Sequence, residues 1–145
     1  ELARSLDEKN LVFSDEGKKE LAILTAALSE IIDNTIKAFS AKDLTLAVKV
    51  EPLEDVIDIL VDQIKANYIN RLQNKLSSLE AGFIFMDLLT NYERISDHCS
   101  NIALTVIELI QENVEAHEYM LNVKSSPDDD FIRRFENYKK KYNLN

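Results

Sequence analysis

The feature that most constrains this sequence is an apolar repeat that runs without a break over residues 85–109. Steps of three and four residues alternate through Phe85, Leu88, Tyr92, Ile95, Cys99, Ile102, Val106 and Leu109. This alternation places apolar side chains on one face of a long helix. A face of this length needs neighbouring helices of similar length, nearly parallel or antiparallel, to cover it. The repeat therefore predicts a bundle of long helices.

The low content of turn-forming residues excludes the main alternatives. Only two Gly and two Pro occur among 145 residues, whereas a β-sandwich or barrel needs a turn about every ten residues. A doubly wound nucleotide-binding fold needs more Gly for its phosphate loop alone. Because 46% of the residues are hydrophobic, the chain can still build a substantial core. We therefore expect an all-α fold.

Apolar periodicity and capping residues predict two helices in the first half of the chain. The first covers about residues 14–40, with Ser14 or Asp15 as its N-cap. The second covers about residues 43–76, with Asp43 as its N-cap. Pro52 lies inside the second helix and removes one backbone hydrogen bond, so we expect a kink or a fresh helix start just before it.

Two further helices are predicted in the second half. Ser77 and Glu80 form a capping box at the start of the third helix, which ends around residues 115–119. The fourth helix is short, covers about residues 127–142, and has Ser126 as its N-cap.

Short connections between these helices favour antiparallel neighbours. The predicted fold is all-α: an antiparallel three-helix bundle of long helices with a short fourth C-terminal helix. We expect residues 1–145 to form a single domain, with its core in residues 14–119.

The charge balance narrows the classes of partner. Lys and Arg number 17 and Asp and Glu 26, so the net charge is −9. An acidic surface repels phosphate backbones, which argues against nucleic acid and favours cations. No apolar stretch approaches the ~20 residues of a membrane span, so we expect this chain to be soluble. Because it begins at Glu1 and not at Met, we expect a piece of a longer or processed protein.

Acidic residues recur at four-residue spacing in the second and third helices. Glu54 and Asp58 form one such pair, and Glu93 and Asp97 another. Like charges at this spacing repel each other, so a chain that stacks several pairs is suited to holding a cation. Oxygen ligands favour Mg²⁺, Ca²⁺ or Mn²⁺, and addition of His98 would extend the range to iron or zinc. The alternative interpretation is a solvated acidic surface. The same spacing recurs in Glu51 and Asp55, and in Asp58 and Asp62.

Residues that would indicate catalysis do not form a motif. The single cysteine, Cys99, lies on the apolar repeat and is predicted to be a buried apolar group. A ferritin-like di-iron site would need Glu-x-x-His, but Ile95 precedes His98 by three residues and Val114 precedes His117. We therefore do not expect an enzyme.

The segment from Tyr92 to Ala103 resembles the signature of the PhoU family of phosphate-transport regulators. Eight positions match: Glu93, Arg94, Ile95, Asp97, His98, Asn101, Ile102 and Ala103. Ser96 replaces a Gly of that pattern, Cys99 an Ala and Leu104 a Glu. Glu54 and Asp58 match the acidic positions of the preceding helix. Residues 67–72 and 80–89 resemble the PhoU-like domains at the cytoplasmic C-terminus of bacterial sodium/phosphate cotransporters, although Asn67 stands where His is frequent.

The resemblance implies a non-catalytic regulator built from a three-helix bundle. It implies that Glu54, Asp58, Glu93 and Asp97 are candidate ligands of divalent, iron or zinc ions, with no other cofactor. The implied role is a cytoplasmic regulatory domain that controls phosphate uptake by a cotransporter in the inner membrane. Its partner is then the membrane portion of the same chain, or a phosphate importer or sensor; a homodimer stays open. The alternatives are a free-standing PhoU-type regulator and a metal-free helical adaptor.

Overall fold

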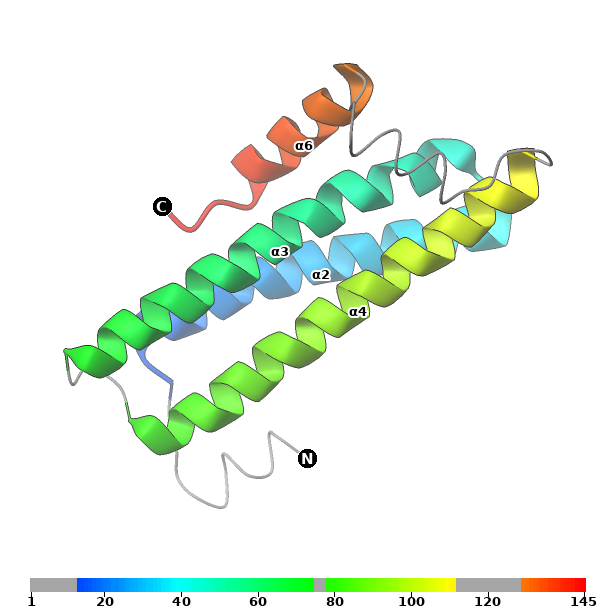
Figure 1. The fold of residues 1–145 in the computed structure, drawn as a ribbon. Coiled ribbons are helices and arrows are strands. Elements are labelled where there is room, and N and C mark those ends of the chain that lie inside the picture. The colour runs from blue at the N-terminus through cyan, green and yellow to red at the C-terminus, as the bar shows by residue number, and fades with distance from the viewer. Residues whose placement is uncertain (1–12, 75–77, 112–128) are drawn as a thin grey trace.

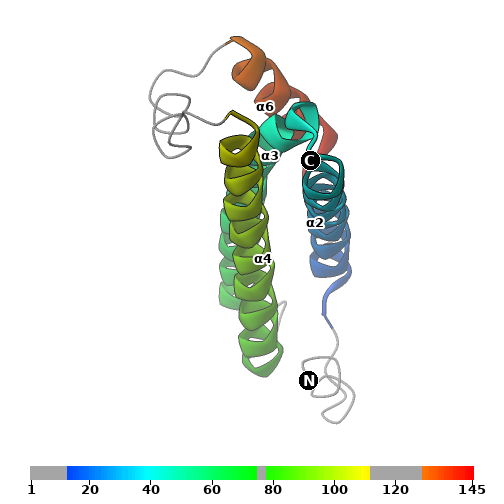
Figure 2. The same cartoon turned by 90° about the vertical axis from the view of Figure 1, so that its right-hand side faces the viewer.

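Three long helices form an antiparallel bundle, and a shorter helix packs on one of them (Figures 1 and 2). The computed structural model describes residues 13–74, 78–111 and 129–145. Within these ranges the helices are α2 (Asp15–Ala41), α3 (Leu44–Gln73), α4 (Leu79–Gln111) and α6 (Asp129–Lys141). The three long helices all contact one another, and α6 contacts α3. The predicted fold class is confirmed.

The predicted starts of the first two helices are confirmed. Ser14 Oγ accepts a hydrogen bond from the backbone N–H of Gly17 at 3.1 Å. Asp43 Oδ1 accepts one from the N–H of Leu46 at 3.2 Å. Between α2 and α3 the chain reverses at Lys42, whose φ of 50° is left-handed. Local capping chemistry therefore fixes this connection.

The predicted capping box at the third helix was placed one residue too early. The cap is Ser78, whose Oγ accepts from the backbone N–H of Ala81 at 3.1 Å; Ser77 lies outside the described residues. Either serine of the pair can cap a helix, so the local sequence does not choose between them. Tyr68 Oη donates to the carbonyl of Ser78 at 2.5 Å, and this contact between helices holds Ser78 at the helix start.

Pro52 does not interrupt the second helix, so the predicted fresh start is wrong. Helix α3 runs continuously from Leu44 to Gln73 with Pro52 inside it. The neighbouring side chains Val50 and Leu53 are fully buried in the bundle. Proline removes a single hydrogen bond of the helix, and burial of these neighbours offsets that loss.

The main core lies between the three long helices. The apolar periodicity that predicted the first two helices is confirmed, because its members are buried in this core: Leu24, Leu28 and Ile31 from α2, and Leu53, Ile57, Leu60 and Ile64 from α3. Phe85 and Leu89 extend the core along α4.

The predicted apolar repeat of α4 is correct at alternate positions only. Phe85, Cys99 and Val106 are buried, as expected. The intervening members are not: Ile95 is 37% exposed, Ile102 43% and Leu109 64%. In place of Ile95 and Ile102, the following residues Ser96 and Ala103 are buried. Small side chains permit closer approach of two helices, so packing selected them over the larger neighbours.

Helix α6 attaches to the bundle through an apolar face. Phe131 is buried, and Phe135 and Tyr138 pack against the main core. At its end, Lys141 Nζ forms an ion pair with Glu30 Oε2 at 2.6 Å, and Tyr142 Oη donates to the same carboxylate. The predicted cap at Ser126 and the predicted end of the third helix at 115–119 lie outside the described residues.

Candidate metal centre

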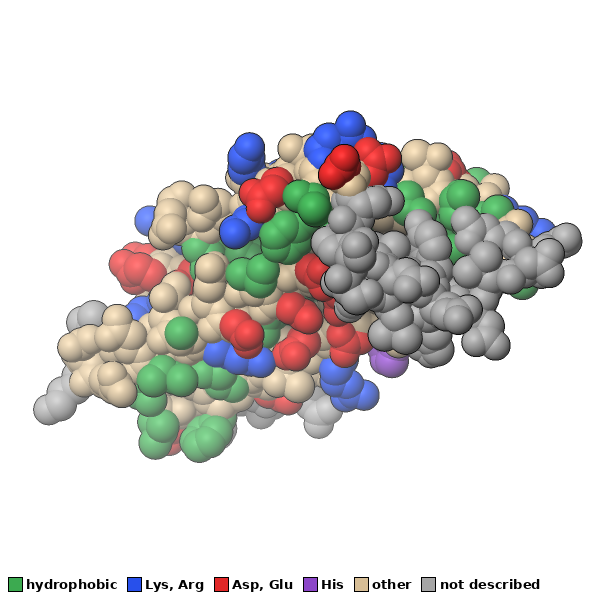
Figure 3. Space-filling model, turned by 45° about the horizontal axis from the view of Figure 1, so that its top comes forward, with side chains coloured by type: hydrophobic (Ala, Val, Ile, Leu, Met, Phe, Trp, Pro, Cys, Tyr) green, Lys and Arg blue, Asp and Glu red, His purple; other side chains and the backbone are tan. Residues whose placement is uncertain are grey.

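Carboxylates from α3 and α4 meet on one face of the bundle, where acidic side chains gather in Figure 3. Glu54 and Asp58 of α3 and Asp97 of α4 each place one oxygen within 4.8 Å of the others. Glu54 is buried, Asp58 half-buried and Asp97 exposed. The group, which we call the carboxylate cluster, thus extends from the helix interface to the surface. It brings together three of the four predicted ligands.

Helix geometry explains the convergence. Glu54 and Asp58 are one turn apart, so they share a face of α3. Because Ser96 and not Ile95 faces the bundle interior, the following residue Asp97 turns toward α3. The sequence-based orientation of α4 would have directed Asp97 straight out to solvent. The correction of the apolar repeat is therefore what completes the cluster.

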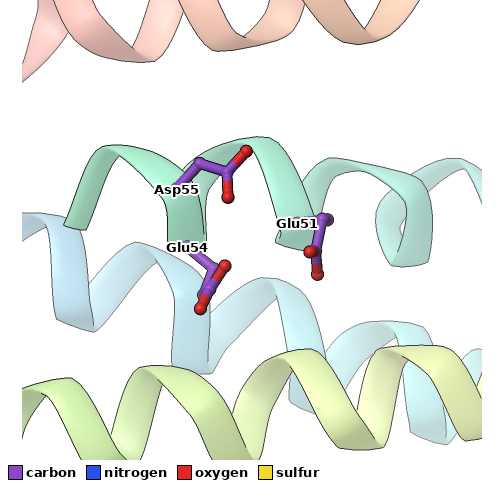
Figure 4. A group of neighbouring side chains, drawn as sticks. All are labelled: Glu51, Glu54 and Asp55. Atoms are coloured by element: carbon purple, nitrogen blue, oxygen red, sulfur yellow. The ribbon is translucent and has the colours of Figure 1, made fainter. Parts of the chain in front are cut away.

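A second group of acidic side chains shares Glu54 with the cluster. Glu51, Glu54 and Asp55 also place one oxygen each within 4.8 Å of one another. Figure 4 shows Glu51 and Glu54 directed from α3 toward α4. Glu51 Oε2 accepts a hydrogen bond from Ser100 Oγ of α4 at 2.5 Å. Glu51 and Asp55 were not among the predicted ligands, although their spacing is the same as that of Glu54 and Asp58.

The fourth predicted ligand, Glu93, lies in a different environment. Its Oε2 forms an ion pair with Lys65 Nζ of α3 at 3.0 Å. Both side chains are partly exposed. Glu93 lies one helical turn before Asp97 on α4. Among the described residues, it belongs to neither acidic group.

The donor set fits a hard divalent cation. Every member of the two groups offers a carboxylate oxygen, which is the ligand that Mg²⁺, Ca²⁺ and Mn²⁺ prefer. His98 is exposed and belongs to neither group within the described ranges, so the nitrogen ligand expected for zinc is not supplied there. Ionised carboxylates this close repel one another, and burial of Glu54 strengthens the repulsion, so a bound cation would stabilise the arrangement.

Three of the departures from the family pattern, at Ser96, Leu104 and Asn67, replace no member of the carboxylate cluster. Ser96 is fully buried, and its hydroxyl has no hydrogen-bond partner among the described residues. Leu104 is half-buried two turns beyond Asp97 on α4. Asn67, the departure on α3, donates to Glu20 Oε1 at 2.8 Å and serves a contact with α2.

Comparison with known proteins identifies the family of this chain. Residues 21–106 match the PhoU domain. Over 130 residues, 86% of this chain, the sequence is 26% identical to the phosphate-specific transport system accessory protein PhoU homolog 1 of Thermotoga maritima. The match covers 56% of that relative, so the chain spans about half of its length. A search of solved structures gave no significant match. With a PhoU domain over more than half of its residues, the chain belongs to the PhoU family.

Proposed function

We propose that this chain is a non-catalytic regulatory domain that controls phosphate uptake and binds a hard divalent cation at the carboxylate cluster. The observation that carries the proposal is the approach of Glu54, Asp58 and Asp97 to within 4.8 Å of one another from two helices. These residues occupy acidic positions of the PhoU pattern. The relative from Thermotoga maritima is named as an accessory protein of phosphate transport, which supports the same role here.

The finer proposal places the domain on the cytoplasmic side of a sodium-dependent phosphate cotransporter in the inner membrane. The resemblance of residues 67–72 and 80–89 to such transporter domains supports it. No helix in the described ranges combines the length and apolarity needed to cross a bilayer, so transport would reside in another part of the parent protein. The gene upstream of Glu1 tests this proposal: several apolar segments of ~20 residues are expected, and their absence would contradict it.

A free-standing regulator is the second candidate, and the name of the relative favours it. In that case the partner is a separate phosphate importer or sensor. An open reading frame that encodes only PhoU-like sequence would support this candidate.

The cation would link two helices. Glu54 and Asp58 would hold it from α3 and Asp97 from α4, and the ion would neutralise the local negative charge. A ligand that binds only the folded state stabilises it by about 2.7 kcal/mol at a concentration of 100 Kd. For a chain of this size, that stabilisation raises Tm by several degrees.

Metal titration of protein purified without a histidine tag tests the site. We expect Mg²⁺, Ca²⁺ or Mn²⁺ to raise Tm, and Glu54→Gln or Asp97→Asn to abolish the rise. Glu93→Gln is the matched control, because its carboxylate pairs with Lys65 and its loss should leave metal binding nearly unchanged. Failure of all three ions to bind, by calorimetry as well as by Tm, would support the metal-free adaptor.

The regulatory role needs a separate measurement. In cells that carry the full-length parent, we expect Asp97→Asn to change phosphate uptake at high external phosphate, whereas Glu93→Gln should behave as the wild type. Metal binding in vitro without any effect of Asp97→Asn on uptake would contradict the link between the cation and regulation.

A further inference from the structure

Helix α6 lies outside the matched PhoU domain and combines aromatic with basic side chains. Four rings follow one another at steps of four, three and four residues, so they form a stripe along one side of the helix and its end. This aromatic stripe consists of Phe131, Phe135, Tyr138 and Tyr142. It packs on the bundle, because Phe131 and Tyr142 are buried there. In Figure 1, α6 lies along α3 at the outside of the three long helices.

The charge of this segment is opposite to that of the rest of the chain. Residues 133–141 contain five Lys or Arg and one Glu, a charge of +4, and no nine-residue stretch that does not overlap them exceeds +2. Since the whole chain carries −9, the other residues together carry −13. Asp129 and Asp130 begin the helix, and Glu136 is the last acidic residue before Asn145. Positive charge is therefore concentrated in the second half of α6.

Most of these basic side chains do not hold α6 on the bundle. Lys141 pairs with Glu30 of α2. Arg133 pairs at 2.7 Å with Asp130 of its own helix, and both are more than half exposed. The three others form no ion pair with the described residues: Arg134, Lys139 and Lys140. Cationic groups on the outside of an acidic molecule are available to an anionic surface in the surroundings.

The attachment of α6 is shallow. Phe131 is the only buried residue within the helix, whereas Phe135 and Tyr138 are half-buried. Ile132, beside the stripe, is 46% exposed, so α3 does not cover all the apolar surface of the helix. Elements with few buried side chains separate from the rest of a protein at a lower cost in free energy than core helices do. The place of α6 on α3 is therefore one that another apolar environment can replace.

The combination of side chains identifies the kind of environment. A helix with aromatic residues on one side and Lys or Arg on the other is suited to the boundary between the headgroups and the acyl chains of a bilayer. The rings enter the apolar layer, and the basic groups contact the phosphates of anionic lipids. Lys141 loses Glu30 when α6 leaves the bundle, and a lipid phosphate then replaces that carboxylate. Nucleic acid also presents phosphates, but it offers the aromatic stripe no apolar layer to offset repulsion by the −13 of the other residues.

We propose that α6 is a membrane-binding helix, which leaves α3 and inserts the aromatic stripe into the surface of an anionic bilayer. The arrangement on α3 is then the form that the chain adopts away from such a surface. The proposal is independent of the metal proposal, because the carboxylate cluster lies between α3 and α4. It applies equally to a free-standing regulator and to a domain of a larger protein.

Co-sedimentation of the chain with lipid vesicles in EDTA tests the proposal. We expect Kd on vesicles of equal parts phosphatidylglycerol and phosphatidylcholine to be at least tenfold lower than on pure phosphatidylcholine. Lys139→Gln/Lys140→Gln should raise Kd on the anionic vesicles about tenfold or more. Lys18→Gln/Lys19→Gln is the matched control: it removes the same charge from two exposed positions of α2, so Kd should stay within twofold of the wild type. Circular dichroism verifies that each variant is folded.

A tryptophan reporter tests whether the stripe enters the bilayer. Since the chain contains no Trp, Phe135→Trp gives a single fluorescent side chain in the stripe, and Ile132→Trp gives a second one at an exposed position beside it. On anionic vesicles, lipids with brominated acyl chains should quench both. They should leave Phe83→Trp unquenched, because Phe83 is 72% exposed on α4, away from α6.

Several results would overturn the proposal. One is a chain that does not bind anionic vesicles, or that binds neutral vesicles equally well. Another is a loss of binding that is as large for Lys18→Gln/Lys19→Gln as for Lys139→Gln/Lys140→Gln. Vesicle binding without quenching at positions 132 and 135 would show that α6 stays on α3. Binding of a single-stranded oligonucleotide as tight as that of anionic vesicles would identify nucleic acid as the partner instead.

Discussion

Arg71 of α3 holds both carboxylate oxygens of Glu20 on α2. Its Nη1 donates to Oε1 at 3.0 Å and its Nη2 to Oε2 at 2.8 Å. Each side chain is only 11% exposed. The guanidinium also lies over the ring of Tyr68, 5.8 Å from its centroid, and Asn67 donates to the same carboxylate. The pair therefore fixes the position of α2 along α3.

Removal of either partner should destabilise the fold strongly, since it leaves a buried charge without its counter-charge. We expect Arg71→Ala or Glu20→Ala to lower the free energy of unfolding by about 3 kcal/mol. The double variant should lose much less than the sum of the two single losses. Urea denaturation of the four proteins measures this coupling. Lys37→Ala is the control, because its ion pair with Asp33 is more than half exposed and contributes about 0.5 kcal/mol or less. Single losses below 1 kcal/mol would contradict the interpretation.

Gly82 is required by the contact of Tyr68 with α4. A Cβ at position 82 would lie 2.6 Å from Tyr68 Oη and 2.8 Å from its Cε1. The Tyr68 ring cannot move aside easily, because it stacks on Phe85 at a centroid distance of 5.0 Å. We expect Gly82→Ala to lower the unfolding free energy by about 1–3 kcal/mol, although Ala is the better helix former.

Gly17→Ala is the comparison for this prediction. A Cβ there would lie 3.2 Å from Ser14 Oγ. The hydroxyl needs to move only slightly to relieve this contact, so the change in stability should stay within about 0.5 kcal/mol. Thermal unfolding of both variants measures the two changes in stability. An equal or smaller loss for Gly82→Ala would show that α4 can move away from Tyr68.

The attachment of α6 should weaken at alkaline pH. Burial raises the pKa of Tyr142 well above its ordinary value of 10.0, and the hydrogen bond to Glu30 and the charge of that carboxylate raise it further. Above pH 10 the unfolded chain releases this proton while the folded chain retains it. The stabilisation is therefore complete below pH 10 and is lost as the pH rises toward the folded-state pKa.

Tyr142→Phe isolates this effect. Below pH 10 the variant should be about 1–2 kcal/mol less stable, since it lacks the hydrogen bond to a charged acceptor. Above pH 10 its stability should fall less steeply than that of the wild type, by up to about 1.4 kcal/mol per pH unit for one proton. Urea midpoints between pH 8 and 11.5 test this, and parallel curves for the two proteins would contradict it.

Cys99 should react slowly with thiol reagents. The side chain is 6% exposed. Burial raises the pKa of the thiol, although a hydrogen bond with the Thr35 side chain opposes the change. Burial thus limits the access of a reagent to the sulfur, and it lowers the fraction of thiolate, which is the reactive form. We expect labelling by a disulfide reagent at least a hundredfold slower than in urea, and fast labelling of Cys99→Ala/Thr105→Cys. Rapid modification of native Cys99 would indicate that α4 opens locally.

Local chemistry allowed the helices and two of their caps to be predicted from the sequence. The caps at Ser14 and Asp43 accept hydrogen bonds from residues three positions later, and such contacts depend on neighbouring residues alone. The apolar periodicity of α2 and α3 was equally predictable, because residues three and four positions apart lie on the same side of a helix. The four-residue spacing that places Glu54 beside Asp58 belongs to the same local geometry.

The orientation of α4 was not predictable in this way. Ile95 and Ser96 are both compatible with an inward position by spacing, and the larger apolar residue was the natural expectation. Only close packing of α4 against the other helices places Ser96 inside. The sequence alone thus determined the helical elements and the acidic pairs within each helix. The tertiary structure decided that Asp97 joins Glu54 while Glu93 pairs with Lys65, because contacts between helices depend on their rotation and register, which no short-range interaction sets.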